Sequence, residues 1–402
     1  MRPVKIIDRE LKEFSRFFSK PQFSHFREYV IGLYISYGRK TVVNINENTD
    51  NGTDQSQLNR FLTNPKWNVK GLQEKYEEYA ILNVLKNSSK YVFLIFDDTV
   101  KPVSVKNKIE GVAKYFDHAE KHYVWGHKFF TSAITNGNGL TVPFVIEIYR
   151  KRSDSRVHGI KYRKITNIAK ETVEKFALID TGLKEKVALF DTFYACKKIL
   201  KTCIQSEVHF VTKVKSNKKF IVNNKILNVK ELSRFMPFVG ETIIKDSRYE
   251  YSKPISVEWN GVGTVFLVRS RLKGHKEVQY FITDIAFLNG TEILELYSKR
   301  WEIESMHRDL KQSIGFGDYM TRKIEAVKTH VFLSSIAYAI LSKIRFVIIR
   351  SYLGKVGEEI YRKIKKYFTI SKLCKLLRKG LWTKVIINLT GVKFNILKNA
   401  KL

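Results

Sequence analysis

Two short apolar runs, each ending in aspartate, constrain the fold of this chain most. Residues 91–98 read YVFLIFDD, an unbroken series of strand-forming residues that closes in two acids. Residues 187–191 read VALFD and precede a helical stretch. A strand that is apolar on both faces has to be covered on both, as in sheets that carry helices on each side. We therefore expect an α/β protein with a buried central sheet.

The order of elements around these runs predicts a particular sheet. Two further strands, 124–135 and 140–149, flank the tetrapeptide Asn-Gly-Asn-Gly, which strongly favours a hairpin turn. A helix at 165–179, the VALFD strand, a helix at about 192–203 and a strand at 208–214 follow. This βββαβαβ order is that of a ribonuclease H-like fold, a mixed five-stranded sheet flanked by helices.

The chain divides by pattern into five segments. We expect a helical N-terminal domain at 1–90, the first part of the core at 91–212, a β-rich insertion of short alternating strands at 213–286, the second part of the core at 287–350, and a basic C-terminal region at 351–402.

Charge indicates the kind of partner. Lys and Arg number 72 against 39 Asp and Glu, which gives a formal net charge of +33 spread along the chain. Lysine-rich thermophilic proteins usually carry acids in comparable numbers for surface ion pairs, and here they do not. Nucleic acid is therefore the expected partner, and the helical N-terminal domain is expected to bind DNA.

Cysteine usage and hydropathy predict a cytoplasmic protein. The three cysteines are odd in number and form no CxxC pair, so neither a disulfide framework nor a structural zinc site is indicated. The N-terminus lacks the apolar core of a signal peptide, and the most apolar stretch, Val331 to Leu341, is too short to span a bilayer. No membrane partner is expected.

The aspartates at the ends of the two apolar runs are candidate metal ligands. An unpaired charge beside a buried strand is costly, so Asp97 should emerge at a sheet edge or face a cation. Asp191 has the same setting, at the carboxyl end of a strand where ligands of open α/β sheets gather. A turn or a helix cap is the commoner role for a lone Asp. Asp98 remains an alternative to Asp97, because alternation gives the two side chains opposite faces.

The segment YSKRWEIESMHRDLK carries the strongest local pattern. On a continuous helix, Tyr297, Arg300, Glu304 and Lys311 fall within an arc of about 60°. One face then presents an acid, two cations and a phenol, while Glu302 points away. The alternative is a plain i,i+4 salt bridge between Arg300 and Glu304 on a solvated helix.

These residues together resemble a known family. The Tyr-(2)-Arg-(3)-Glu-(6)-Lys spacing, the Asp-x-Thr at 97–99, the strand-Asp-helix at 191 and the β-rich insertion before the glutamate are similar to the insertion-sequence-four group of DDE transposases. Residues 55–67, QSQLNRFLTNPKW, resemble the segment that precedes the first strand in such proteins. The likeness covers about residues 50–345.

The resemblance implies a cut-and-paste transposase with a two-metal site. Asp97, Asp191 and Glu304 would be the catalytic residues and hold two Mg²⁺ or Mn²⁺ ions. Arg300 and Lys311 would clamp phosphates, and Tyr297 would contact a phosphate or the terminal nucleotide. The partners would be double-stranded DNA, as transposon terminal inverted repeats and as target, and a second copy of the chain in a homodimer. The resemblance also implies a prokaryotic protein that is associated with the nucleoid.

Three further residues are weaker DNA-binding candidates. Family members with a β-rich insertion stack a Trp on a flipped base, and Trp259 is the only tryptophan of this insertion, although a core role is about as expected. His127 and Lys128 in the second strand could approach DNA, although a strand His is more often structural. Two other functions stay open, a ribonuclease H-like nuclease that joins no ends and a non-catalytic DNA-binding protein derived from a transposase.

Overall fold

The computed structural model describes residues 5–49, 54–103, 109–117 and 121–379, and it divides into two compact units. The part of the expected basic region beyond residue 379 lies outside the described residues. The units, each discontinuous in sequence, are a helical unit (Met1–Asn83, Lys101–His127 and Ser305–Leu402) and a sheet unit (Val84–Val100 and Lys128–Glu304).

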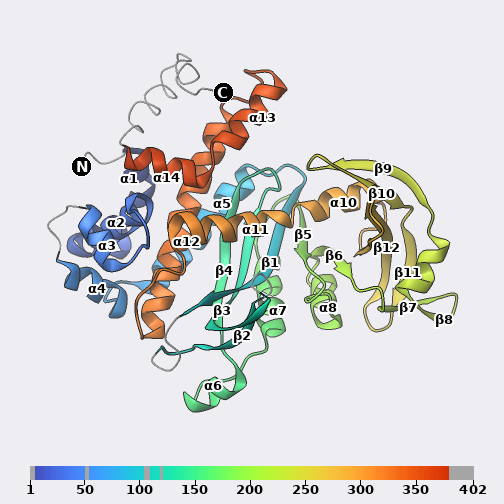
Figure 1. Ribbon diagram of the computed structural model, residues 1–402, viewed down its shortest axis with the longest axis horizontal. Coiled ribbons are helices and arrows are strands. Elements are labelled where there is room, and N and C mark those ends of the chain that lie inside the picture. The colour runs from blue at the N-terminus through green and yellow to red at the C-terminus, as the bar shows by residue number, and fades with distance from the viewer. Residues whose placement is uncertain (1–4, 50–53, 104–108, 118–120, 380–402) are drawn as a thin grey trace. The chain divides into compact units, whose positions relative to one another are not determined.

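The sheet unit is built on a mixed, open sheet with strand order β4-β3-β1-β5-β6 (Figure 1). Its strands are β1 (Tyr91–Pro102), β3 (His122–Thr135), β4 (Thr141–Tyr149), β5 (Glu185–Phe190) and β6 (His209–Val214). The pairs β1–β5 and β5–β6 are parallel, and β3–β4 is antiparallel. The helices α6 (Arg152–Val157), α7 (Ile165–Ala177) and α8 (Lys197–Gln205) lie between strands of this sheet in sequence. The expected α/β fold, ribonuclease H-like with flanking helices, is confirmed.

Aromatic packing fixes the register of the central strands. Phe96 of β1 stacks on Phe190 of β5 with ring centroids 4.8 Å apart, and Tyr194 closes on Phe96 edge-on at 5.1 Å. All three side chains are fully buried. Because Asp97 and Asp191 each directly follow one of the stacked phenylalanines, the packing also sets where the two acids leave the sheet.

The β-rich insertion extends this sheet, because β13 pairs antiparallel with β6. Its alternating strands appear where the sequence predicts them. Its elements are β7 (Lys219–Val222), β8 (Lys225–Asn228), α9 (Val229–Leu232), η2 (Ser233–Phe235), β9 (Phe238–Ile244), β10 (Ser247–Ser252), β11 (Ile255–Trp259), β12 (Gly263–Leu272) and β13 (Val278–Thr283).

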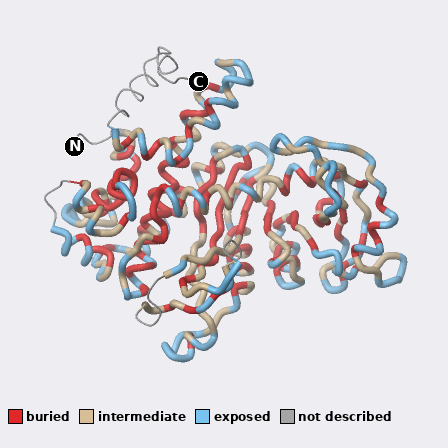
Figure 2. Tube along the Cα trace, viewed as in Figure 1, coloured by how far each residue is buried: buried red, intermediate tan, exposed pale blue. Residues whose placement is uncertain are grey.

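The helical unit surrounds α12, whose long apolar course is buried (Figure 2). This helix is long and apolar enough to cross a membrane by composition, but 72% of its apolar window is buried inside the protein, as in a core helix. The helical unit contains α1 (Lys5–Lys12), η1 (Ser15–Phe17), α2 (Lys20–Ile35), α3 (Val42–Thr49), α4 (Gln55–Thr63), most of α5 (Val69–Lys86), β2 (Ala113–Asp117), α12 (Ile324–Arg350), α13 (Glu358–Tyr367) and α14 (Ile370–Arg378).

Two expected helices differ from the structure. The continuous helix expected to carry Tyr297 to Lys311 is broken into α10 (Gly290–Ser298) and α11 (Trp301–Asp309), followed by a π-helical turn. The break falls where Lys299 and Arg300 make i→i−3 backbone bonds in place of the helical pattern, so the 60° arc of a continuous helix does not apply as drawn. The helix expected from about residue 192 begins at Lys197, because the residues after Asp191 form a turn.

Candidate active site

Asp97 and Asp191 leave the sheet at the same edge. The parallel register of β1 with β5 pairs Ile95 with Leu189, and each aspartate lies two residues further along its strand. The prediction that Asp97 ends its strand is wrong, because β1 continues to Pro102. What ends near Asp97 is the parallel pairing with β5, and that frees its carboxylate on this side of the sheet.

Burial governs the protonation of Asp97. Desolvation raises the pKa of its carboxyl from 3.8 to about 7, the Asp98 backbone N–H lowers it, and the charges of Asp191 and Asp98 raise it further. Arg300 acts in the opposite direction. A cation next to a carboxylate that is buried in this way stabilises its ionised form, as a metal ion does for its carboxylate ligands.

Asp191 accepts a hydrogen bond in a turn and also carries a partly buried carboxylate charge. Its Oδ1 accepts the backbone N–H of Phe193 at 3.0 Å, so the turn anticipated for a lone Asp is present. It is not the cap of α8, because Cys196 occupies the N-cap position. Burial nevertheless raises the pKa of Asp191. One oxygen is therefore occupied by the turn while the carboxylate as a whole remains short of positive charge.

Asp97 and Asp98 face different partners. Asp98 Oδ2 is 2.7 Å from Lys128 Nζ, and its Oδ1 accepts the Tyr194 hydroxyl at 3.1 Å. Asp97 instead faces Arg300, whose Nη1 is 3.8 Å from Asp97 Oδ2. The alternation expected from the sequence is thus realised, with Asp98 neutralised by Lys128 and Asp97 on the side of Arg300.

Arg300 is the common neighbour of the three acids. Its Nη2 pairs with Glu304 Oε1, its Nη1 faces Asp97, and its charge lowers the pKa of Asp191. The i,i+4 salt bridge considered as an alternative is therefore present, but within a cluster of acids and not on a solvated face. Arg300 Nε is buried and has no hydrogen-bond partner among the described residues. A buried guanidinium nitrogen without an acceptor is costly, and a phosphate oxygen would satisfy it.

Glu302 turns away from this cluster, as the helical geometry predicted. Its Oε2 accepts the Thr135 hydroxyl at 2.8 Å and also the Thr141 hydroxyl, so it ties the start of α11 to the β3–β4 hairpin. Glu302 thus has a structural role that positions Glu304 two residues later.

Tyr297 lies beside the cluster but is largely covered. The side chain is 8% exposed, and burial raises its pKa. Arg300 and Lys213 both lie over its ring, at 5.7 and 5.4 Å from the centroid. The phenol therefore supports two cations of the site.

Lys213 and Trp301 belong to the site's surroundings and were missed in the sequence. Lys213 on β6 is partly buried, its pKa is lowered by that burial, and Glu304 and Asp191 are among the charges that act on it. A lysine within the apolar strand VHFVTKV was the signal that could have identified it. Trp301 is 52% exposed next to Arg300, with Lys245 Nζ 5.1 Å from its ring.

Three other predicted site residues have the following settings within their own units. Lys311 is exposed and belongs to the helical unit. His127, also in that unit, is fully buried, and its ring nitrogens bond Tyr319 Oη at 2.7 Å and the Glu110 carbonyl at 2.8 Å. Trp259 is 2% exposed in the insertion, so a base could stack on it only if the ring left its position.

The donor set suits a hard divalent cation, although it is not closed around one point. Within the described ranges, no group of three or more His, Cys, Asp or Glu is gathered closely enough to hold a metal ion. The available donors are nevertheless carboxylate oxygens, which Mg²⁺ and Mn²⁺ prefer, and two of them are held against their own ionisation by burial. The three acids therefore have the oxygen ligands that a divalent metal ion prefers, although their carboxylates do not surround a single metal position.

Comparison with known proteins decides the family. Residues 13–228, more than half of the chain, match the family model described as DDE superfamily endonuclease. The chain belongs to this family. Residues 164–340 also match the model described as transposase DDE domain. No curated protein matches the chain.

The two matches bracket the acid cluster of this DDE protein. Asp97 and Asp191 lie within the first, and Asp191 and Glu304 within the second. They support a DDE transposase, a nuclease-type enzyme that acts on DNA and belongs to a superfamily that generally uses divalent metals.

Proposed function

We propose that this DDE protein is a cut-and-paste transposase of the insertion-sequence-four group, which cleaves DNA at transposon ends and joins the ends to target DNA by two-metal phosphoryl transfer. The observation that supports it most is the convergence of Asp97, Asp191 and Glu304, from three different elements of the sheet unit, around Arg300.

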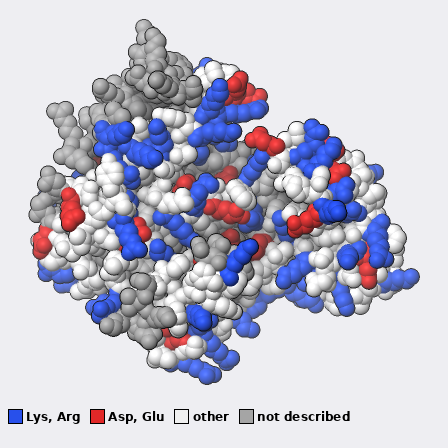
Figure 3. Space-filling view, viewed as in Figure 1, with Lys and Arg blue, Asp and Glu red and all other residues white. Residues whose placement is uncertain are grey.

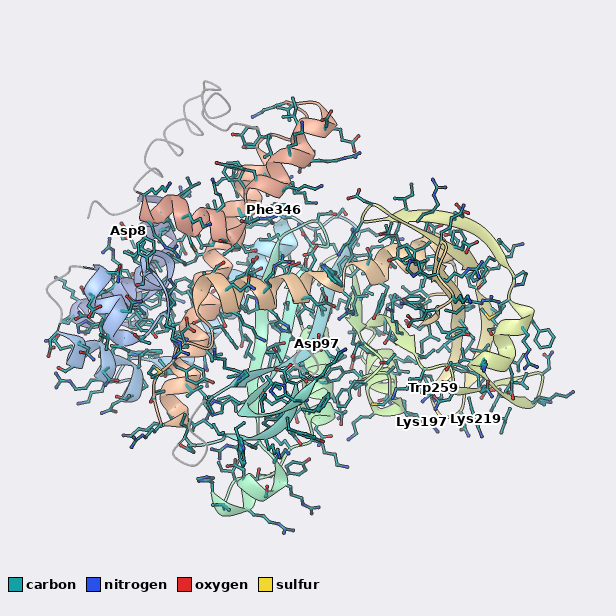
Figure 4. All side chains as sticks on the ribbon, in the orientation of Figure 1. Asp8, Asp97, Lys197, Lys219, Trp259 and Phe346 are labelled. Atoms are coloured by element: carbon teal, nitrogen blue, oxygen red, sulfur yellow. The ribbon has the colours of Figure 1, made fainter. Side chains whose placement is uncertain are left out.

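Asp97, Asp191 and Glu304 would hold two Mg²⁺ or Mn²⁺ ions. When bound, these ions would activate the attacking water or 3′-hydroxyl and stabilise the leaving oxygen, so the protein needs no covalent nucleophile. The residues of the chain supply the ligands and the surrounding charge. Figure 4 labels Asp97 within the sheet unit.

Cations around the acids would bind the DNA backbone. Arg300 has an unsatisfied Nε and planar geometry suited to a phosphate. The Tyr297 ring would steady that cation, Lys213 over the same ring would add a second positive charge, and Lys311 of the Tyr-Arg-Glu-Lys motif would add a point charge. Lys128 would order Asp98 and thereby the part of β1 that carries Asp97. Duplex DNA with terminal inverted repeats is the expected substrate, and pairing two ends calls for at least a homodimer.

Replacement of the glutamate tests the catalytic assignment. Glu304→Gln removes a charge but keeps the shape, so we expect cleavage of a transposon-end duplex in Mg²⁺ to fall by more than about a hundredfold while binding of that duplex changes little. The matched control is Glu295→Gln, an exposed acid on α10. Equal loss of binding and cleavage in Glu304→Gln would show a structural role instead.

The products separate transposition from plain cleavage. A pre-cut end incubated with circular target DNA and Mg²⁺ should give strand-transfer joints, which Glu304→Gln and chelation should both abolish. Cleavage without strand-transfer joints would indicate a nuclease. Binding without any metal-dependent product would indicate a non-catalytic DNA-binding protein.

A further inference from the structure

Two lysine-bearing segments with five lysines between them approach Trp259 and the turn that follows it, on the insertion side of the sheet unit. We call the five lysines the lysine cluster: Lys197 and Lys201 of α8, and Lys215, Lys218 and Lys219 at the β6–β7 turn. Figure 4 labels Lys197, Lys219 and Trp259 close to one another. The lysines come from two sequence segments and form one surface only in the folded chain.

The tryptophan forms the floor under one of these lysines. Lys218 Nζ lies 3.7 Å from the centroid of the Trp259 ring, and Phe220 packs on the same ring edge-on at 5.6 Å. A cation over an indole face is held by the ring's electron density. The ring thus fixes the position of an ammonium group, which accounts for Trp259 without a flipped base.

The β11–β12 turn brings in the other segment. A Cβ built on Gly261 would lie 3.5 Å from Lys197 Nζ and 3.9 Å from Lys201 Cε. Gly261 has φ +76°, so the turn keeps a residue without a side chain where the two lysines pass. Burial lowers the pKa of Lys218, and the charge of Lys197 lowers it too. The ammonium groups of the two segments are therefore close enough to repel.

This repulsion is not offset by an ion pair in the part of the chain that the structure describes. Among the residues described here, none of the five lysines takes part in an ion pair, although acids pair with cations elsewhere in the insertion, as in Glu250 with Arg271. Lys and Arg also predominate over acids on the face of the molecule that Figure 3 shows. A group of like charges held together without counter-charge indicates an anionic partner.

We propose that the lysine cluster binds the phosphate backbone of duplex DNA next to the cleavage site, without reading its sequence. The inference rests on the proposed action on DNA. It adds a second contact surface, because α8 begins six residues after Asp191 and β6 carries Lys213, so both lysine segments lead away from the acid cluster within one unit. Regularly spaced phosphates suit several separate ammonium groups better than a single small anion does.

Binding of the full chain to a short duplex of unrelated sequence, in EDTA, tests the lysine cluster. The variant Lys197→Gln with Lys201→Gln alters exposed residues only, and the triple variant adds Lys218→Gln. We expect the slope of log affinity against log salt to fall by about two and about three, respectively. The charge-matched control is Lys253→Gln with Lys276→Gln, exposed lysines in the β10–β11 and β12–β13 connections and not in the β11–β12 turn that holds Gly261, for which the slope should not change.

The outcomes are distinguishable. Lysine-cluster variants that keep the slope of the control pair overturn the inference and leave the proposed function standing. A wild-type chain that fails to bind duplex DNA overturns both. Thermal unfolding of each variant reports whether Lys218→Gln disturbs the packing of Trp259. If it does, a lower slope in the double variant alone supports the inference.

Discussion

Asp97 carries a free-energy cost that the metal-free protein bears. Its folded pKa of about 7 exceeds the ordinary 3.8, so between these values the folded chain holds a proton that the unfolded chain has lost. Stability therefore falls as pH rises through this window, and the full cost is present above pH 7. We expect Asp97→Asn to stabilise the metal-free protein by about 1–3 kcal/mol at pH 8 and by much less at pH 4.5, measured by urea unfolding in EDTA.

The control for this prediction is Asp180→Asn. Asp180 is exposed, and its Oδ1 accepts the Gly182 N–H at 2.9 Å, a bond that an Asn side chain can keep. Its replacement should leave stability unchanged at both pH values. A destabilised Asp97→Asn at pH 8 would mean that Arg300 compensates the buried charge fully. Mg²⁺ should stabilise the wild type and not Asp97→Asn.

The position of Asp97 and Asp191 beside buried strands and the pairing of Arg300 with Glu304 could be predicted from the sequence, whereas the other partners of the acids could not. Asp97 and Asp191 end unbroken apolar runs, and such a pattern is local. Arg300 as the shared neighbour and Lys213 as a nearby cation depend on strands far apart in sequence. Trp259 shows the same limit, because composition identified the only tryptophan of the insertion but only packing reveals Lys218 over its ring.

At the scale of elements, α12 is joined to α2 through a histidine that must stay neutral. His330 is fully buried, and its Nε2 donates to the Gly315 carbonyl at 2.9 Å, so Nδ1 accepts the Tyr29 hydroxyl at 2.6 Å. Burial lowers the pKa of His330 from 6.5 to about 4. Between these values the unfolded chain binds the extra proton, so this contribution is present above pH 6.5 and lost as pH falls toward 4.

Histidine-detected NMR checks the neutral state of His330. With ¹⁵N-labelled histidine, its ring should remain neutral at pH 5, and urea unfolding should show up to about 3 kcal/mol less stability at pH 4.5 than at pH 7 from this group. A conservative His330→Gln variant identifies the resonance and should flatten this part of the pH dependence. Titration of the ring near pH 6.5 in the folded protein would contradict the burial argument.

Elements with a continuous local pattern could be predicted, and those set by pairing could not. The hairpin at Asn136 to Gly139 and the strands β1 and β5 follow from apolar runs and turn residues. The short β2 lacks such a run and exists because the start of β3 pairs with it. The break at Lys299 leaves no mark in the periodicity, since residues on both sides still favour helix.

At the scale of the whole molecule, the net charge of +33 predicts how DNA binding responds to salt. Each phosphate neutralised by Lys or Arg releases counterions, so affinity for a duplex should fall by about a thousandfold between 50 and 200 mM salt if six or more phosphates are contacted. Equilibrium binding at several salt concentrations measures the slope, and thermal unfolding over the same range controls for loss of folded protein. Terminal-repeat duplex should retain a larger share of its affinity at high salt than unrelated duplex, because base contacts release no counterions. An affinity that does not change with salt would mean that the excess positive charge does not bind DNA. Both the proposal that the acid cluster acts on DNA and the proposal that the lysine cluster binds DNA would then fail.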